Sequence, residues 1–263
     1  MNRQTFISCS LTSLVALVTP GENVFAPVTA AVGPLVLVHG AWHGGWCWKY
    51  VKRILNNKSI EVFTPTLTGL GDRHHLNIFT NLDTHIADIV NLIESEELSD
   101  VTLVGHSYAG MVITGVADKL RGRIKKLIYV DAFVPDSGQC VFDLLSDERR
   151  KMLMQTVNAT QKIPPLSARF LGVTNSHDIA WLNRRMMPQR ASTFSQKLFF
   201  NDISEIKRVY IHCMNPPSGS FGQFARRFAD DPTWKYFELN TGHDCMITAP
   251  QDLASVIIQE MDS

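Results

Sequence analysis

Short apolar runs rich in β-branched residues alternate with amphipathic helical patterns along most of the chain, from Pro34 onward. The runs that we expect to be strands are PLVLV (34–38), IEVFT (60–64), VTLVG (101–105), KKLIYVD (125–131), RVYIHC (208–213) and KYFELN (235–240). Continuous apolar strands separated by amphipathic helices are typical of a parallel sheet that helices cover on both faces. The sequence therefore predicts an α/β fold with a doubly wound, mostly parallel sheet.

This alternation stops between Phe133 and Ile206. The sequence there is polar, with interspersed Met, Phe, Trp and Pro, and stretches such as LLSDERRKMLMQTV have a helical pattern. A segment of this length without a strand pattern is too long for a plain loop. We therefore expect a single domain over residues 31–263, with a helical cap, or lid, inserted at about residues 134–206.

Composition limits the class of ligand. The chain has 263 residues, 45% of them apolar, so it can bury one sizeable core. Its 25 Lys and Arg residues balance its 25 Asp and Glu residues, and such a chain lacks the basic surface that nucleic acids or anionic membranes require. We expect a small, weakly charged ligand and no nucleic-acid partner, and composition leaves the oligomeric state open.

Residues 1–30 have the features of an export signal. An apolar stretch over residues 6–18 precedes a segment rich in small residues at 24–33, where a signal peptidase could cut. Pro20 and Gly21 end the apolar stretch short of the roughly 20 residues that a membrane span needs. We expect a removable signal and a periplasmic or secreted protein. The alternative is a disordered N-terminal extension on a cytoplasmic protein.

The cysteines give no sign of a metal site. Four remain if the signal is removed, and no C-x-x-C pair is present to suggest zinc. One disulfide and four buried thiols are equally compatible with their spacing. The four positions are Cys47, Cys140, Cys213 and Cys245.

Residues 105–110, GHSYAG, join an expected strand to the helical segment MVITGVADKL. Reactive groups of a doubly wound sheet lie at the carboxyl ends of its strands, which is where Ser107 is expected. A nucleophile on a tight strand-to-helix turn needs small residues two positions before and after it, and Gly105 and Ala109 meet that need. A serine that only caps the helix is the alternative. The flanking strand and helix favour the nucleophile.

A serine hydroxyl is a poor nucleophile until a base removes its proton, so a histidine must lie at the same edge. Of the nine histidines, His243 follows the last expected strand and precedes the last helix. His212 lies inside a strand that we expect to be buried, and His106 directly precedes the serine. His85 and His177 are expected to be solvated. His243 is therefore the expected base.

The carboxylate that orients His243 is harder to find. In many proteins with a Ser-His-acid set on such a sheet it follows the penultimate strand, but here that strand is followed by no acid before Asp230. The strand before it ends at Asp131, at the same edge of the sheet. We therefore expect Asp131, with Asp136 and Asp244 as weaker candidates. Asp244 is too close in sequence to reach the far ring nitrogen of its neighbour easily.

Acyl transfer also needs backbone N–H donors for the oxyanion of the tetrahedral intermediate, each typically contributing about 3–4 kcal/mol. One is expected at Tyr108, directly after the serine, and the other at Ala41, in a loop rich in glycine and aromatic residues. Glycines there let the backbone approach a substrate, and the cap supplies apolar walls. The candidate pocket residues are Gly40, Trp42, His106 and Trp181.

The chain from Pro34 onward resembles the α/β-hydrolase superfamily, and more narrowly the branch of small bacterial carboxylesterases, plant methylesterases and plant hydroxynitrile lyases. The stretches that carry the resemblance are LVHGAWHGGWCW, FTPTLTGLGDRHHL, LVGHSYAGMVITGVAD and VDAFVPDSG. In the lyases a threonine follows the histidine of the first loop and a lysine follows the catalytic histidine. This sequence has Gly40 and Asp244 there, so the resemblance implies hydrolysis rather than cyanohydrin cleavage.

These features together predict a serine carboxylesterase with a Ser-His-Asp triad and an acyl-enzyme intermediate. The expected substrate is a small apolar or aromatic ester, and neither a metal nor an organic cofactor is expected. Two alternatives stay open. The same residues would cleave an amide or carbamate, and a receptor of this fold would bind a ligand with little turnover.

Overall fold

The computed structural model describes residues 33–76, 79–216 and 219–261, so the expected signal over residues 1–30 lies outside the described part. Its main sheet has six strands in the order β2-β1-β3-β4-β7-β8, and each neighbouring pair is parallel. This confirms the predicted parallel α/β sheet. The strands are β1 (Leu35–Val38), β2 (Val62–Phe63), β3 (Val101–His106), β4 (Ile124–Val130), β7 (Lys207–Cys213) and β8 (Trp234–Leu239).

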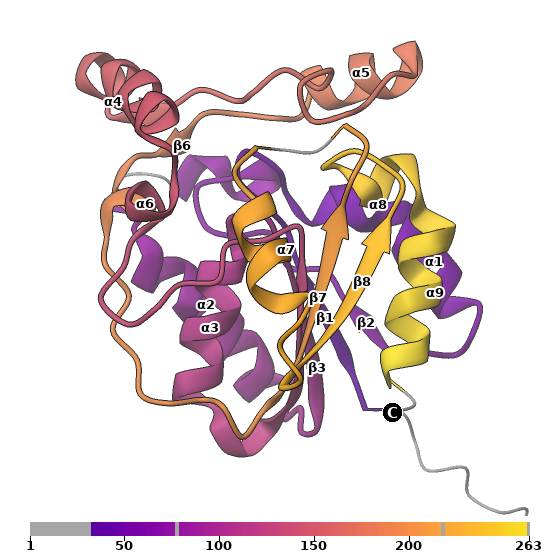
Figure 1. Ribbon diagram of the computed structural model, residues 1–263. Coiled ribbons are helices and arrows are strands. Elements are labelled where there is room, and N and C mark those ends of the chain that lie inside the picture. The colour runs from indigo at the N-terminus through magenta and orange to yellow at the C-terminus, as the bar shows by residue number, and fades with distance from the viewer. Residues whose placement is uncertain (1–32, 77–78, 217–218, 262–263) are drawn as a thin grey trace, which may run out of the picture. The chain divides into compact units, whose positions relative to one another are not determined.

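Helices cover both faces of this sheet (Figure 1). Helices α1 and α9 contact each other on one face, and α2 and α3 contact each other on the opposite face, where α7 packs on β7 and β8. The sheet is therefore doubly wound, as predicted. The bounds are α1 (Lys49–Asn56), α2 (Leu82–Ser95), α3 (Ala109–Lys119), α7 (Gly222–Phe228), α8 (Cys245–Thr248) and α9 (Pro250–Met261), with 3-10 turns at Gly45–Trp48, Gly71–Leu76, Arg121–Arg123 and Val141–Leu144.

The alternation of side chains along each strand divides the core into two layers. Val36 and Val38 belong to the layer that packs under α2 and α3, whereas Leu35 and Leu37 belong to the layer that includes Ile257 of α9. All four residues of β1 are fully buried, because both faces of a parallel sheet are covered. This explains why the strands are continuous apolar runs in the sequence rather than alternating ones.

The segment between β4 and β7 carries three helices and a small antiparallel pair of strands, and it lies beyond the carboxyl ends of the main strands (Figure 1). Its short strands were not predicted, because two residues are too few to show a period. The elements are α4 (Asp147–Thr160), β5 (Lys162–Ile163), α5 (Ser176–Asn183), β6 (Gln189–Arg190) and α6 (Ser192–Ser195).

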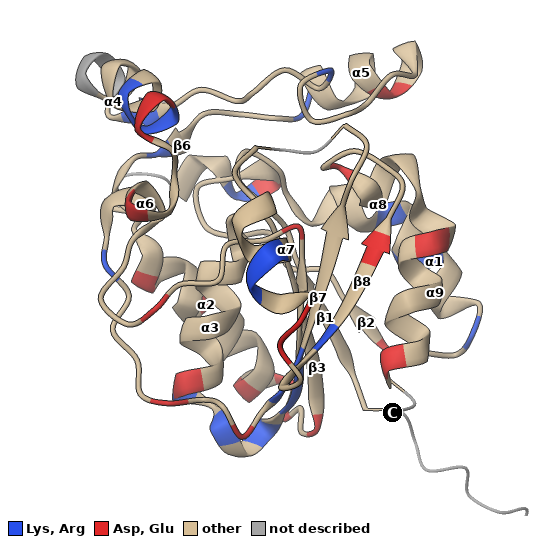
Figure 2. Cartoon of the chain, viewed as in Figure 1, with Lys and Arg blue, Asp and Glu red and all other residues tan. Residues whose placement is uncertain are grey.

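Charged residues of both signs are interspersed over the elements, as the balanced composition suggested (Figure 2). No helix in the described ranges is long and apolar enough to span a membrane. The four cysteines that the structure describes, Cys47, Cys140, Cys213 and Cys245, are buried free thiols, which is one of the two arrangements that their spacing left open.

Close packing of α3 against the loop after β4 gives a test of the fold. A methyl group at Gly110 would overlap the carbonyl oxygen of Phe133, whereas a methyl group at Gly122 would meet no atom within 4 Å. We expect Gly110→Ala to lower the free energy of unfolding by about 1–3 kcal/mol, although alanine normally favours a helix over glycine. Thermal denaturation should show a midpoint lower by about 3–10 °C. Gly122→Ala is the control, and equal midpoints for both variants would contradict this account of the packing.

Candidate active site

Ser107 lies on a strained turn between β3 and α3. Its φ angle is +56°, in the left-handed region that disfavours residues other than glycine. A side chain at Gly105 would approach the carbonyl group of Ala109 at 2.9 Å, so the turn needs a small residue there. The serine is 7% exposed. The tight strand-to-helix turn that the sequence predicted is therefore present.

Two further strained residues lie at the same edge of the sheet. Trp42, after β1, has a φ angle of +67°, and Asp131, directly after β4, has one of +40°. Backbone strain of this kind persists only where the surrounding structure enforces it, and it concentrates at functional sites. The three strained positions thus mark the carboxyl edge of β1, β3 and β4 as the candidate site.

His243, in the loop after β8, donates from Nδ1 to Oδ2 of Asp131 at 2.6 Å. Both side chains are buried. The contact spans 112 residues of sequence and depends on the parallel order of β4, β7 and β8. Because Nδ1 carries the donated proton, the other ring nitrogen, Nε2, is left as the one that can accept a proton.

Asp131 receives two further hydrogen bonds, both on Oδ1. Nδ1 of His212 donates at 3.1 Å and the backbone N–H of Cys213 donates at 3.3 Å. Burial opposes the charge of this carboxyl group, but the hydrogen bonds from His212 and His243 hold its pKa below the usual value. Asp131 is therefore an ionised carboxylate that three donors fix in one orientation.

Aromatic rings hold His243 from two sides. The ring of Phe221 stacks on it at 4.8 Å between centroids, and the ring of His106 lies 4.5 Å away. Nε2 of His106 donates to the backbone carbonyl of His243 at 2.9 Å. Burial, and then the neighbouring His243, lower the pKa of His106 to about 3, so His106 is a neutral donor that fixes the loop of His243.

Asp244 is engaged elsewhere. Its Oδ2 accepts from Nε2 of His43 at 3.2 Å, and both residues are buried. Burial alone would lower the pKa of His43 and raise that of Asp244, but their mutual attraction wins, so the pKa of His43 is raised and that of Asp244 is lowered. The two residues form a buried ion pair next to His243. Among the described residues, Nδ1 of His243 donates to Asp131 and makes no hydrogen bond to Asp244.

Side-chain atoms of His106, His243 and Asp244 lie within 4.8 Å of one another, a spacing that could suit a metal ion. One ring nitrogen of each histidine donates to an oxygen of the protein, and the other nitrogen, Nδ1 of His106 or Nε2 of His243, keeps its lone pair. One oxygen of Asp244 already accepts from His43. The lone pair of His243 Nε2 is the one that a catalytic base needs, so we treat the cluster as part of the candidate active site and assign no metal to it.

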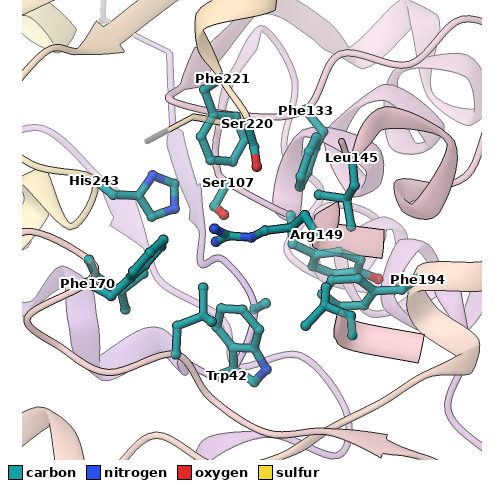
Figure 3. A pocket seen from close by; sticks show the side chains of 15 residues that line it. Trp42, Ser107, Phe133, Leu145, Arg149, Phe170, Phe194, Ser220, Phe221 and His243 are labelled. Carbon is teal, nitrogen blue, oxygen red and sulfur yellow. The ribbon is translucent and has the colours of Figure 1, made fainter. Parts of the chain in front are cut away.

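A cavity opens over Ser107 (Figure 3). The walls are mostly apolar and come both from the sheet edge and from the segment between β4 and β7. The lining residues are Ala41, Trp42, Ser107, Tyr108, Phe133, Leu145, Arg149, Leu153, Leu166, Phe170, Leu171, Phe194, Ser220, Phe221 and His243.

Two backbone donors border this cavity. The N–H groups of Ala41 and Tyr108 belong to residues that line it together with Ser107. Within the described part of the chain, neither N–H donates to a protein acceptor. Buried backbone donors nearly always have a partner, so these two groups are available to a ligand.

Of the four pocket residues predicted, Trp42 alone lines the cavity. Gly40 lies behind the serine, where a side chain would strike His106 and Ser107. Trp181 is absent from the cavity lining and packs edge-on against Trp46 at 5.0 Å between ring centroids. Gly40, His106 and Trp181 therefore do not line this cavity; the sequence suggested them by nearness to the serine and histidine or by residue type.

His85 was also placed wrongly by sequence. It is fully buried rather than solvated, and its Nδ1 contacts the hydroxyl group of Tyr108 at 2.9 Å while Nε2 donates to the carbonyl of Thr68 at 2.9 Å. Burial lowers the pKa of His85 to about 4. It is a neutral residue that fixes the side chain of Tyr108 and hence the turn after the serine.

Comparisons with known proteins agree with this geometry. The model of the alpha/beta hydrolase family matches residues 35–256. A carbendazim hydrolyzing esterase from Nocardioides sp. (strain SG-4G) is 41% identical over 239 residues, 83% of this chain and 96% of that protein. An alpha-hydroxynitrile lyase from Arabidopsis thaliana is 33% identical over 241 residues, 83% of this chain and 93% of that protein.

A solved structure shares the same fold. It is an extracellular alpha/beta-hydrolase from a Paenibacillus species, with a TM-score of 0.77 and 24% identity, and the match covers 86% of this chain and 98% of that one. The family match spans nearly all of the described residues, so the resemblance seen in the sequence is confirmed. The chain belongs to the alpha/beta hydrolase family and is an enzyme of the hydrolase type.

Proposed function

We propose that the protein is a serine carboxylesterase that cleaves small apolar or aromatic esters through Ser107, His243 and Asp131. The observation that carries the proposal is the 2.6 Å contact between His243 and Asp131, made by a histidine that lines one cavity with Ser107. A serine on a strained turn, a histidine held by a carboxylate and two free N–H groups are the parts that acyl transfer requires.

The proposed reaction begins when Nε2 of His243 takes the proton of Ser107 as the hydroxyl oxygen attacks the ester carbonyl. Asp131 stabilises the imidazolium that forms and keeps the proton of Nδ1 in place. The N–H groups of Ala41 and Tyr108 bind the oxyanion. His243 then protonates the leaving alcohol, and a water molecule hydrolyses the acyl-enzyme by the same route.

The buried pair of His43 and Asp244 supports hydrolysis over cyanohydrin cleavage. A cyanide anion would need a positive group next to His243, but the following residue is an ionised aspartate. The relative at 41% identity is named an esterase, which agrees with the proposal.

The segment between β4 and β7 supplies about half of the cavity wall. Eight of the 15 lining residues come from this segment, which the proposal treats as the cap over the serine. This segment is tied to the loop after β1, because Nε1 of Trp42 donates to the carbonyl of Ile163 and the N–H of Met187 donates to the carbonyl of Trp42. The wall over the serine is thereby held in place.

Turnover of a short-chain p-nitrophenyl ester tests the proposal. We expect the wild-type protein to release p-nitrophenol steadily over many equivalents, because His243 would activate a water molecule to hydrolyse the acyl-enzyme. Release would be followed from the first equivalent onward by absorbance. A receptor with an intact triad would stop near one equivalent of product and show a ligand-dependent rise in melting temperature. That outcome would replace the esterase proposal with the receptor.

A further inference from the structure

The cavity over Ser107 contains one permanently charged side chain. Arg149, in the first turn of α4, is the single Lys, Arg, Asp or Glu residue among the 15 that line it. Its guanidinium group reaches into the cavity toward Ser107 and His243 (Figure 3). None of the other residues lining this cavity offers a carboxylate to the guanidinium.

The neighbouring arginine shows a different arrangement. Arg150 donates to Asp147 of the same helix at 2.6 Å, on the protein surface. Across the described residues, Arg149 has no carboxylate or carbonyl partner for its guanidinium, which stacks over the ring of Phe170 at 4.5 Å. The guanidinium of Arg149 thus reaches into a mostly apolar cavity without a carboxylate partner.

Two features of this placement oppose the positive charge of Arg149. A positive side chain in the first turn of a helix faces the positive end of the helix dipole. Partial burial also opposes the charge and lowers the pKa of Arg149. Because arginine remains protonated at neutral pH, the cavity holds an uncompensated positive charge. The stacking on Phe170 stabilises the guanidinium in part but supplies no counter-charge. The missing counter-charge points to a ligand that supplies it.

We propose that Arg149 selects aromatic esters that carry a carboxylate on the ring, away from the scissile ester group. The guanidinium would bind this carboxylate through two parallel N–H···O bonds. The aromatic walls, among them Trp42, Phe133 and Phe194, suit the ring of such a substrate. The inference rests on the proposed esterase function and narrows its substrate class from apolar aromatic esters to anionic ones.

Two matched pairs of esters test this selection. In the first pair the carboxylate is on the alcohol side, in 4-acetoxybenzoate against neutral 4-acetoxyacetophenone. In the second it is on the acyl side, in monomethyl terephthalate against neutral methyl 4-acetylbenzoate. The measured quantity is the ratio of kcat/KM for the anionic ester to that for its neutral partner, which cancels any general effect of a substitution on rate.

We expect Arg149→Met to lower this ratio by about ten- to a hundredfold for at least one pair, mainly through KM, since a hydrogen bond to a charged group is lost. Arg149→Lys should retain part of the ratio, because it keeps the charge without the planar fork. Arg150→Met is the matched control and should keep the wild-type ratio. If Arg149→Met leaves both ratios within about twofold, the inference is overturned.

A binding measurement separates this inference from the proposed function. In the Ser107→Ala background, calorimetry would compare 4-hydroxybenzoate with neutral 4-hydroxyacetophenone, and monomethyl terephthalate with neutral methyl 4-acetylbenzoate, with and without Arg149→Met. If binding of the anion depends on Arg149 but the wild type shows no turnover, the role of Arg149 in carboxylate binding is supported and the esterase proposal is contradicted. If the wild type turns over steadily, but neither the kcat/KM ratio nor the binding of the anion depends on Arg149, the esterase proposal is supported and the role of Arg149 is contradicted.

Discussion

Ser107→Ala is expected to lower kcat/KM for a short-chain p-nitrophenyl ester by about three orders of magnitude or more, because it removes the attacking oxygen while the cavity and the oxyanion donors remain. The residual rate would come from those donors and from binding. Initial rates of both proteins, measured at equal concentrations of folded protein, provide the test.

Ser220 offers a matched control for this substitution. It is a second serine in the wall of the same cavity and is 8% exposed, close to the 7% of Ser107. Ser220→Ala therefore removes a buried hydroxyl group from the same cavity without touching the strained turn. We expect it to keep activity within a few-fold of the wild type. If the two variants lose activity equally, the role assigned to Ser107 is wrong.

The fold was predictable because its elements are local and strongly patterned. Each of the six expected strands overlaps a strand of the sheet, and the pattern MVITGVADKL coincides with α3 (Ala109–Lys119). A strand buried on both faces must be apolar throughout, so a continuous apolar run in the sequence indicates a strand that helices cover on both faces. The pair β5 and β6 escaped prediction, since its strands are two residues long and are defined only by each other.

The site was predictable only where topology placed residues at one edge. Ser107, Asp131 and His243 each follow a strand of a parallel sheet, so the order of elements was enough to bring them together. The positions of His212 and Arg149 in the site depend instead on the directions in which their side chains point. His212 ends near Asp131 because β7 pairs with β4, and it looked like an ordinary strand residue. Arg149 faces the cavity by its position on α4, which a charged helical sequence does not reveal.

Asp131→Asn should distinguish the carboxylate of Asp131 from every other acid near the site. Oδ1 accepts from both His212 and the N–H of Cys213, so the carbonyl oxygen of an asparagine would stay on that side. Its NH2 group would then face Nδ1 of His243, where Oδ2 now accepts. Two donors cannot bond, so the histidine would shift its proton to Nε2 and lose the ability to take the proton of Ser107. We expect kcat to fall by about 10⁴-fold, as the wrong tautomer causes in other Ser-His-Asp sites.

Asp244→Asn supplies the comparison, because this acid is equally buried and lies next to His243 in sequence but bonds to His43. Its replacement removes the charge of a buried ion pair and should lower the melting temperature. It leaves the contact between His243 and Asp131 intact, so the rate should stay within about tenfold of the wild type. Steady-state kinetics and melting curves of both variants separate the two roles. If Asp244→Asn lowers the melting temperature but keeps the rate, and Asp131→Asn lowers the rate, the carboxylate that orients His243 is Asp131, at the end of β4. If instead Asp244→Asn lowers the rate and Asp131→Asn keeps it, the orienting carboxylate is Asp244.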